Sequence, residues 1–171
     1  CEKQPDVAVI STKYGDMVLE FYPNIAKKHV DSFITHTKNG YFDGTTFHRV
    51  IPGFVIQGGD PNSKDDDRSN DGMGGNAAKF YGEGEEENPD TWTLPAEFND
   101  RLHITGTLSM ARSQAPNSAG SQFFICAGPT PQLDNKYTVF GQVIEGLDVI
   151  QKIVNTPRDR RDNPKKKVEM T

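Results

Sequence analysis

The most informative stretch of the sequence is Phe47-His48-Arg49-Val50-Ile51-Pro52-Gly53-Phe54-Val55-Ile56-Gln57-Gly58-Gly59-Asp60. Its apolar residues predict two short strands separated by a Pro-Gly turn. Side chains alternate along a strand, so Phe47, Arg49 and Ile51 are expected to share one face of the first strand. Gln57 is expected to project from the second strand. The pattern thus predicts an arginine and a glutamine on adjacent strands that are otherwise largely apolar.

Short strand patterns recur along the whole chain, and two helical patterns interrupt them. Apolar residues at helical spacing follow Asn24, which is expected to cap a helix that ends at Asn39, and they recur at residues 147–153. Strands and helices do not alternate regularly, which favours an antiparallel barrel or sandwich. The other expected strands are Val7–Ile10, Met17–Phe21, Thr105–Met110, Gln122–Cys126, Thr138–Val143 and the beginning of one more at Lys165–Thr171.

Composition and charge limit the classes of partner. The chain has 171 residues, which fits one domain, and its 24 acidic and 19 basic residues give a net charge of −5. This surplus of negative charge disfavours nucleic acid and anionic membrane surfaces as partners. The longest apolar run, Phe123–Ala127, is far shorter than the ~18 residues of a membrane-spanning helix.

Residues 61–93 differ from the rest of the chain. They contain Asp65-Asp66-Asp67 and Glu83-Gly84-Glu85-Glu86-Glu87 but few apolar residues. Such a stretch predicts a long surface excursion. Two interpretations stay open, namely a solvated loop and a surface that recruits a basic partner.

Patterns for covalent, metal and nucleotide chemistry do not occur in the sequence. Gly-x-Ser-x-Gly is absent, and the four histidines lack the spacing of a zinc site. Cys126 stands in the most apolar stretch, which favours a buried, unreactive thiol over a nucleophile. Gly72-Met73-Gly74-Gly75 lacks the Gly-Lys-Ser/Thr ending of a phosphate-binding loop. If the protein is an enzyme, we expect it to use no covalent nucleophile, metal ion or nucleotide.

Residues 47–60 and three further segments resemble the cyclophilin-type peptidyl-prolyl cis-trans isomerases. The further segments are Gly106–Ala111, Gly120–Cys126 and Leu133–Gly141, in the order and approximate spacing of that family. The resemblance implies a mainly β fold, an eight-stranded antiparallel barrel capped by two α-helices, with the active site on its outer face. It covers residues 7–171, so residues 1–6 are expected to form an N-terminal tether.

The resemblance also implies the residues of the site. Arg49 takes the place of the catalytic arginine, and Phe54 and Gln57 complete the catalytic group. Neither a cofactor nor a metal ion is implied. The positions that match substrate-binding residues are Val55, Ala111, Arg112, Gln122, Phe124, Leu133 and Tyr137.

Three positions depart from the pattern of the family. Gln132 stands at a common tryptophan, Tyr137 at a common histidine, and Arg112 at a common asparagine. The asparagine position acts mainly through its backbone in the family, so that change is expected to matter least. In the family, this tryptophan supports binding of the ligand cyclosporin more than it supports peptide turnover. Because Gln132 replaces it here, we expect weak cyclosporin binding.

Two function classes fit these residues. Rotation about an X-Pro bond breaks no covalent bond, so a site without a nucleophile can catalyse it. The implied role of Arg49 is to donate to the prolyl nitrogen in the twisted state. The alternative is a non-catalytic module that grips proline-containing segments, but the retained Arg49, Phe54, Gln57 and Phe124 favour an isomerase. The expected partners are proline-containing polypeptides, and a monomer is expected.

The two ends of the chain carry further expectations. A chain that begins at Cys1 resembles a mature bacterial lipoprotein, whose N-terminal cysteine is acylated, and a domain trimmed at its boundary is the equal alternative. The first origin implies the cell envelope, with membrane contact only through a lipid on Cys1. The second leaves a cytoplasmic location open. Val168-Glu169-Met170-Thr171 is expected to begin a strand beside the first one, with the natural C-terminus a few residues further on.

Overall fold

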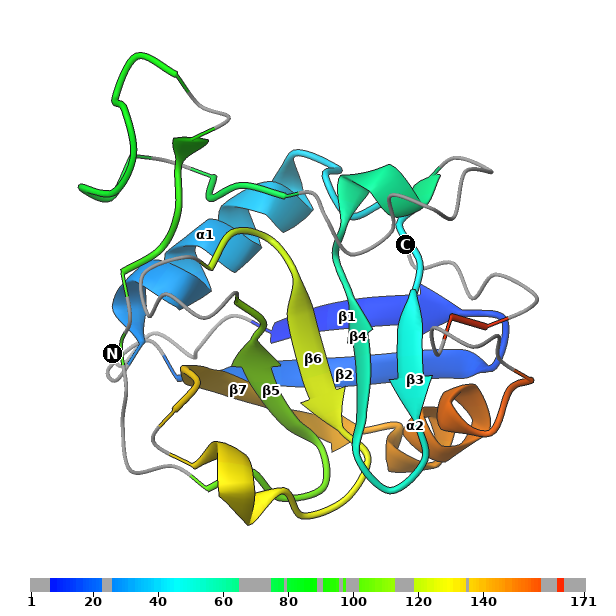
Figure 1. The fold of residues 1–171 in the computed structure, drawn as a ribbon. Helices are drawn as coiled ribbons and strands as arrows, with labels where there is room; N and C mark the ends of the chain where they lie inside the picture. The colour runs from blue at the N-terminus through cyan, green and yellow to red at the C-terminus, as the bar shows by residue number, and fades with distance from the viewer. Residues whose placement is uncertain are drawn as a thin grey trace, which may run out of the picture.

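A single curled antiparallel sheet forms the body of the protein (Figure 1). The computed structural model describes residues 7–22, 26–64, 75–78, 80–88, 91–95, 97, 102–112, 119–134, 136–157 and 163–164. Within these residues the sheet has seven strands in the order β1-β2-β7-β5-β6-β4-β3. The strands are β1 (Val7–Thr12), β2 (Gly15–Phe21), β3 (Arg49–Ile51), β4 (Val55–Gly58), β5 (Thr107–Met110), β6 (Phe123–Cys126) and β7 (Val139–Glu145).

The mainly β class and the antiparallel pairing expected from the sequence are confirmed. The expected barrel has eight strands, and the described residues contain seven of them. The eighth strand was expected at Lys165–Thr171, which lies outside the described residues, as do Cys1 and the tether at residues 1–6. Its predicted pairing with the first strand therefore stays a prediction.

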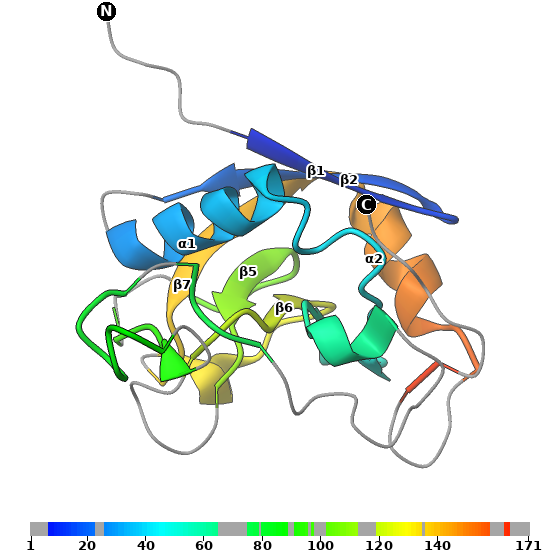
Figure 2. The same cartoon turned by 90° about the horizontal axis from the view of Figure 1, so that it is seen from above.

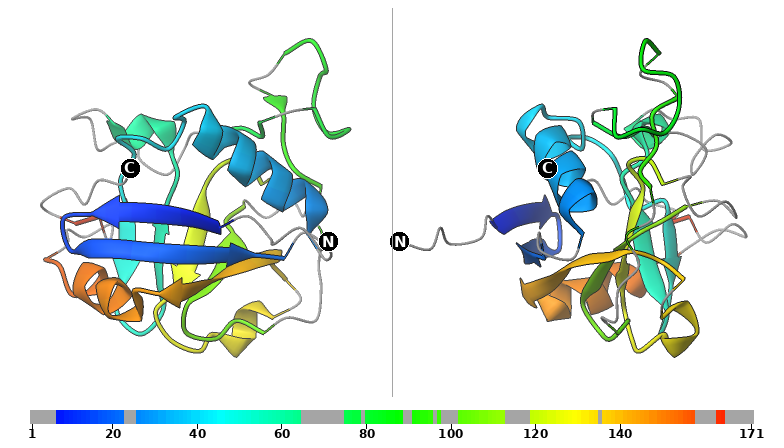
Figure 3. Two further views of the ribbon diagram at one scale, coloured as in Figure 1. Left: turned by 180° about the vertical axis from the view of Figure 1, so that it is seen from behind. Right: turned by 90° about the vertical axis from the view of Figure 1, so that its left-hand side faces the viewer.

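Two helices lie on opposite sides of the β1–β2 hairpin (Figures 2 and 3). Helix α1 (Lys27–Lys38) packs against β7, and α2 (Leu147–Val154) packs against β2, β3 and β4. The residue before α1 is Ala26, which caps the helix with no side-chain hydrogen bond, and the expected cap Asn24 lies outside the described residues. No helix in the described part of the chain is long and apolar enough to cross a membrane.

The turn into α2 requires a glycine. Gly146 has a φ of +94°, and a Cβ there would stand 2.4 Å from the backbone oxygen of Asp16 in β2. A larger residue would therefore push α2 away from the sheet.

An aromatic cluster fills the inside of the curled sheet. Phe33 of α1 lies 4.8 Å from Phe42, 5.2 Å from Phe123 and 5.5 Å from Phe140, measured between ring centroids. Phe123 and Phe140 are fully buried. Close packing of these rings joins α1 to β6 and β7, and so fixes β6, whose outer face carries part of the site described below.

The register of β3 and β4 places Arg49 directly opposite Gln57. The expectation that Phe47 shares a face with Arg49 is wrong, because Phe47 is fully buried in the core whereas Arg49 is exposed. The regular strand begins only at Arg49, so alternation cannot be counted from Phe47. Val50, the next residue, returns to the core.

Part of the excursion at residues 61–93 is docked on α1. The Tyr81 hydroxyl donates to Asp31 Oδ2 at 2.6 Å, and the backbone N–H of Ala78 donates to Ser32 Oγ at 3.0 Å. Burial and this bond to a carboxylate raise the pKa of Tyr81 well above its usual range. The Trp92 indole donates to the backbone oxygen of Glu85 at 3.0 Å. The described part of the excursion is held by specific contacts.

Candidate functional site

The outer face of β4 and β6 borders a cavity of about 260 Å³. Nine of the ten residues that the sequence analysis assigned to the site line it together. The tenth, Gln122, is hydrogen-bonded to one of the nine. The lining residues are Arg49, Phe54, Val55, Gln57, Ala111, Arg112, Phe124, Leu133 and Tyr137.

A row of polar side chains crosses one side of the cavity. Arg49 Nη1 donates to Gln57 Oε1 at 3.4 Å, and Gln57 Nε2 donates to Gln122 Oε1 at 3.1 Å. Gln57 pairs with Arg49 on one side and with Phe124 on the other in the sheet register. The amide oxygen of Gln57 thus contacts the guanidinium at the edge of the cavity, and the guanidinium has further N–H donors for a ligand.

The other side of the cavity is apolar and rigid. Val55, Phe124 and Cys126 are buried on the outer face of the sheet, and half-buried residues pack on them: Phe54, Ala111, Leu133 and Tyr137. The rings of Phe124 and Tyr137 meet edge-on, with centroids 5.6 Å apart and planes at 85°. Such a pair favours one arrangement of the two rings. The wall can therefore hold a small apolar ring beside the guanidinium.

The backbone at Ala111 is fixed by the sheet. Its N–H donates to the carbonyl oxygen of Gln122 at 2.9 Å, which continues the pairing of β5 with β6 beyond Met110. This bond holds the 111–112 backbone at the rim of the cavity. Arg112 leaves the sheet there, and its side chain lines the cavity.

Two other residues singled out in the sequence do not line the cavity. Gln132 is exposed in the short 3₁₀ helix Pro131–Leu133. Cys126 is fully buried beneath the apolar wall, and burial raises the pKa of its thiol to about 11. A thiol with this pKa is protonated at neutral pH, which agrees with the interpretation of an unreactive side chain.

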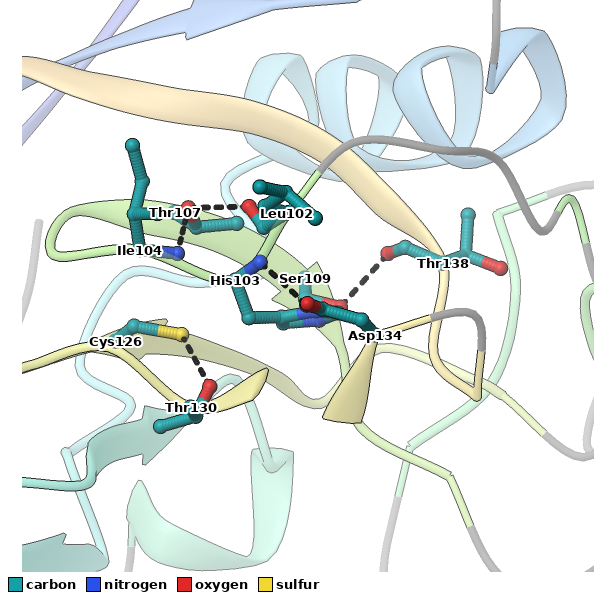
Figure 4. Close-up of polar contacts among 9 residues, drawn as sticks. All are labelled: Leu102, His103, Ile104, Thr107, Ser109, Cys126, Thr130, Asp134 and Thr138. Carbon is teal, nitrogen blue, oxygen red and sulfur yellow. Dashed lines mark hydrogen bonds and ion pairs between the residues drawn. The ribbon is translucent and has the colours of Figure 1, made fainter. Parts of the chain in front are cut away.

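A polar network that sequence reasoning missed is centred on His103 (Figure 4). His103 is buried, and its ring stacks on Phe124 at 5.9 Å between centroids. Its Nδ1 lies 3.0 Å from Asp134 Oδ1, and its Nε2 lies 3.1 Å from Ser109 Oγ. The Ser109 hydroxyl also lies 2.9 Å from the backbone oxygen of Thr138. His103 thus joins β5 to the 131–138 segment, which carries Leu133 and Tyr137 of the cavity.

Burial and hydrogen bonds act in opposite directions on the two ionisable groups of this network. Burial lowers the pKa of His103, against the hydrogen bond to Asp134, which raises it. The backbone N–H of His103 donates to the Asp134 carboxylate at 2.7 Å and is the main reason that the pKa of Asp134 is lowered. Near neutral pH the pair is therefore best described as a neutral imidazole beside a carboxylate. No local sequence signal could reveal it, because His103 and Asp134 are 31 residues apart.

The lining of the cavity offers hydrogen-bond donors and apolar surface. None of the nine lining side chains is a serine, cysteine, histidine or carboxylate. Among the described residues, no three His, Cys, Asp or Glu side chains gather where they could hold a metal ion. An apolar slot beside a fixed guanidinium can bind an apolar ring and donate a hydrogen bond to an atom attached to it.

Comparisons with known proteins identify a family that this chain resembles. Residues 7–171 match the family described as Cyclophilin type peptidyl-prolyl cis-trans isomerase/CLD. A Staphylococcus aureus (strain USA300) protein named "Putative peptidyl-prolyl cis-trans isomerase" is 42% identical over 184 residues, which cover 91% of this chain and 84% of that protein. The peptidyl-prolyl cis-trans isomerase CYP71 of Arabidopsis thaliana is 40% identical over 172 residues, which cover 97% of this chain and 24% of that protein.

A solved structure has the same fold. The cyclophilin type peptidyl-prolyl cis-trans isomerase of Cryptosporidium parvum, determined in the presence of the dipeptide Ala-Pro, superposes with a TM-score of 0.81 at 31% identity. The superposition covers 97% of this chain and 98% of the other.

Proposed function

The chain belongs to the cyclophilin-type peptidyl-prolyl cis-trans isomerase family, and on this premise we propose that the cavity binds X-Pro segments and that Arg49 catalyses their isomerisation. The observation that carries the proposal is the placement of the Arg49 guanidinium opposite an apolar wall in the same cavity. The substrates are proline-containing polypeptides in folding or flexible chains, where X-Pro rotation is slow.

The proposed mechanism stabilises the twisted imide. The barrier of ~18–20 kcal/mol comes from the partial double-bond character of the C–N bond. As the bond twists, resonance is lost, the prolyl nitrogen becomes pyramidal, and its lone pair localises on the nitrogen, where Arg49 donates a hydrogen bond to it. The planar ground state offers no such acceptor, so the hydrogen bond lowers the barrier rather than only tightening binding. Gln57 restrains the guanidinium in advance through the contact at 3.4 Å, which reduces the reorganisation required in the transition state.

The remaining lining residues hold the two parts of the substrate. The apolar wall of Phe54, Val55, Phe124 and Leu133 receives the proline ring. Gln57, Gln122 and the 111–112 backbone hold the peptide on the side that precedes the proline. Contacts on both sides of the X-Pro bond orient the segment beside Arg49, which reduces the freedom that is lost on reaching the transition state. Support for a proline ligand comes from the related Cryptosporidium protein, whose structure was determined with Ala-Pro.

We further propose a monomer that binds cyclosporin only weakly. All ten assigned residues come from one chain, so the site needs no second copy. Gln132 is exposed outside the cavity, and a glutamine there offers a large ligand less apolar surface than a tryptophan.

A proteolysis-coupled assay with an Ala-Pro peptide tests the proposed function. We expect the protein to accelerate the slow cis-to-trans phase in proportion to its concentration. Binding of the peptide without any acceleration would instead support the non-catalytic module that grips proline-containing segments. A protein that neither binds nor turns over X-Pro peptides would contradict both functions.

A further inference from the structure

Arg112 has a defined position on the wall of the cavity. Its Nε donates to the backbone oxygen of Lys136 at 3.2 Å, and its Nη2 donates to the same oxygen. Its Cζ lies 4.8 Å from the centre of the Tyr137 ring, the distance of a cation–π contact. Tyr137 in turn packs edge-on against Phe124. The guanidinium therefore belongs to the site as a side chain, and not only through its backbone.

The residues that line the cavity carry two positive charges and no negative one. The charged pair is Arg49 and Arg112, and the other seven are apolar, aromatic or amide side chains. Guanidinium groups stay protonated throughout the physiological pH range. The chain as a whole has a net charge of −5, so the sign at the cavity is opposite to that of the protein. Apolar walls strengthen the field of such charges, which attracts a carboxylate.

We propose that Arg112 makes the site favour X-Pro segments with an acidic residue directly before the proline. This inference rests on the proposed function, in which the 111–112 backbone holds the peptide on the side that precedes the proline. The Arg112 side chain then lies beside that part of the substrate, whereas Arg49 is engaged at the prolyl nitrogen. A carboxylate on the residue before the proline pairs with the Arg112 guanidinium in both the ground and the twisted state. An acidic residue should therefore lower KM and leave kcat nearly unchanged.

The test compares three peptides that differ only before the proline, namely Glu-Pro, Gln-Pro and Lys-Pro. At low salt we expect kcat/KM for Glu-Pro to exceed that for Gln-Pro by about 3- to 5-fold, with Lys-Pro lowest, as for a partly exposed ion pair. In Arg112→Gln the Glu-Pro to Gln-Pro ratio should fall to about 1, and in Arg112→Glu the order should reverse in favour of Lys-Pro. Raising the salt concentration should reduce the wild-type ratio.

A matched control removes the same charge elsewhere. Lys38→Gln, at the exposed end of α1, should leave the wild-type ratio unchanged, and thermal melting verifies that each variant is folded. A wild-type ratio of 1, or a preference that survives Arg112→Gln, overturns the role of Arg112. Turnover of Gln-Pro reports the proposed function separately. If no peptide is turned over, the proposed function fails, and the dissociation constants of the same peptides decide whether Arg112 selects acidic residues.

Discussion

Replacing Phe124 by alanine is predicted to weaken substrate binding and to destabilise the fold at the same time. Phe124 is 5% exposed on the outer face of β6, where one side of its ring packs on buried residues and the other faces the cavity. Its ring contacts Tyr137 edge-on and His103 face-on. The side chain is therefore both a wall of the site and part of the small outer cluster.

Its position sets the size of both effects. A buried Phe→Ala change usually costs about 3–5 kcal/mol. Phe124 borders the cavity of about 260 Å³, from which solvent can enter the space that the ring leaves, so we expect a value near the lower end of this range, about 3 kcal/mol. A bound proline ring would lose its contact with this wall, and we expect KM to rise by about 10-fold, which corresponds to about 1.4 kcal/mol.

The neighbouring Phe123 supplies a matched control. It points to the opposite face of β6 and is fully buried in the main core. Urea denaturation and peptide kinetics should show that Phe123→Leu lowers the free energy of unfolding with little change in KM. Phe124→Leu should raise KM with a smaller loss of stability than Phe124→Ala. An unchanged KM in both Phe124 variants would refute the assignment of this ring to the substrate pocket.

Three further predictions concern acid stability, cyclosporin and the buried thiol. Burial lowers the pKa of His103 and of His36, so the unfolded chain binds more protons than the folded one as the pH falls below about 6.5. The free energy of unfolding, measured by urea denaturation, should therefore decrease from pH 7.5 to pH 5.5, and His103→Gln should make this decrease smaller. A steeper decrease in His103→Gln would contradict a neutral imidazole at His103 in the folded protein. Gln132→Trp should tighten cyclosporin binding measured by calorimetry, and nanomolar binding by the unmodified protein would show that this residue is unimportant. In a Cys1→Ser background, Cys126 should react with a thiol reagent at neutral pH only after denaturant is added, because burial raises its pKa to about 11; rapid reaction of the folded protein would contradict this.

The sequence was sufficient to predict the parts of the site that lie in contiguous motifs. Arg49 and Gln57 occur in one stretch, and the short Pro-Gly turn between their strands fixes the register that places them opposite each other. Strand alternation failed at Phe47 because the regular strand begins two residues later. Where a strand begins depends on backbone pairing with β4, which the order of apolar residues does not encode.

Contacts between distant segments could not be predicted. The His103–Asp134 pair and the Ser109–Thr138 contact join residues that no local pattern relates. Arg112 was expected to act mainly through its backbone, and only the three-dimensional structure places its guanidinium over Tyr137 on the cavity wall. Such contacts depend on how β5 and the 131–138 segment come together. For the same reason, the residues that support a site are harder to find in a sequence than the residues that line it.

The catalytic role of Arg49 is tested most directly by NMR exchange spectroscopy on an Ala-Pro peptide with the wild-type protein and with Arg49→Ala. This measurement gives both the rate of cis-trans exchange on the protein and the affinity for the peptide. Because Arg49 is exposed and outside the core, the variant should melt close to the wild-type temperature. We expect the exchange rate to fall about 100- to 1000-fold, the usual effect of removing one preorganised donor, while the dissociation constant changes by only a few-fold. Exchange near the wild-type rate in a folded Arg49→Ala protein would contradict the proposed stabilisation of the twisted imide.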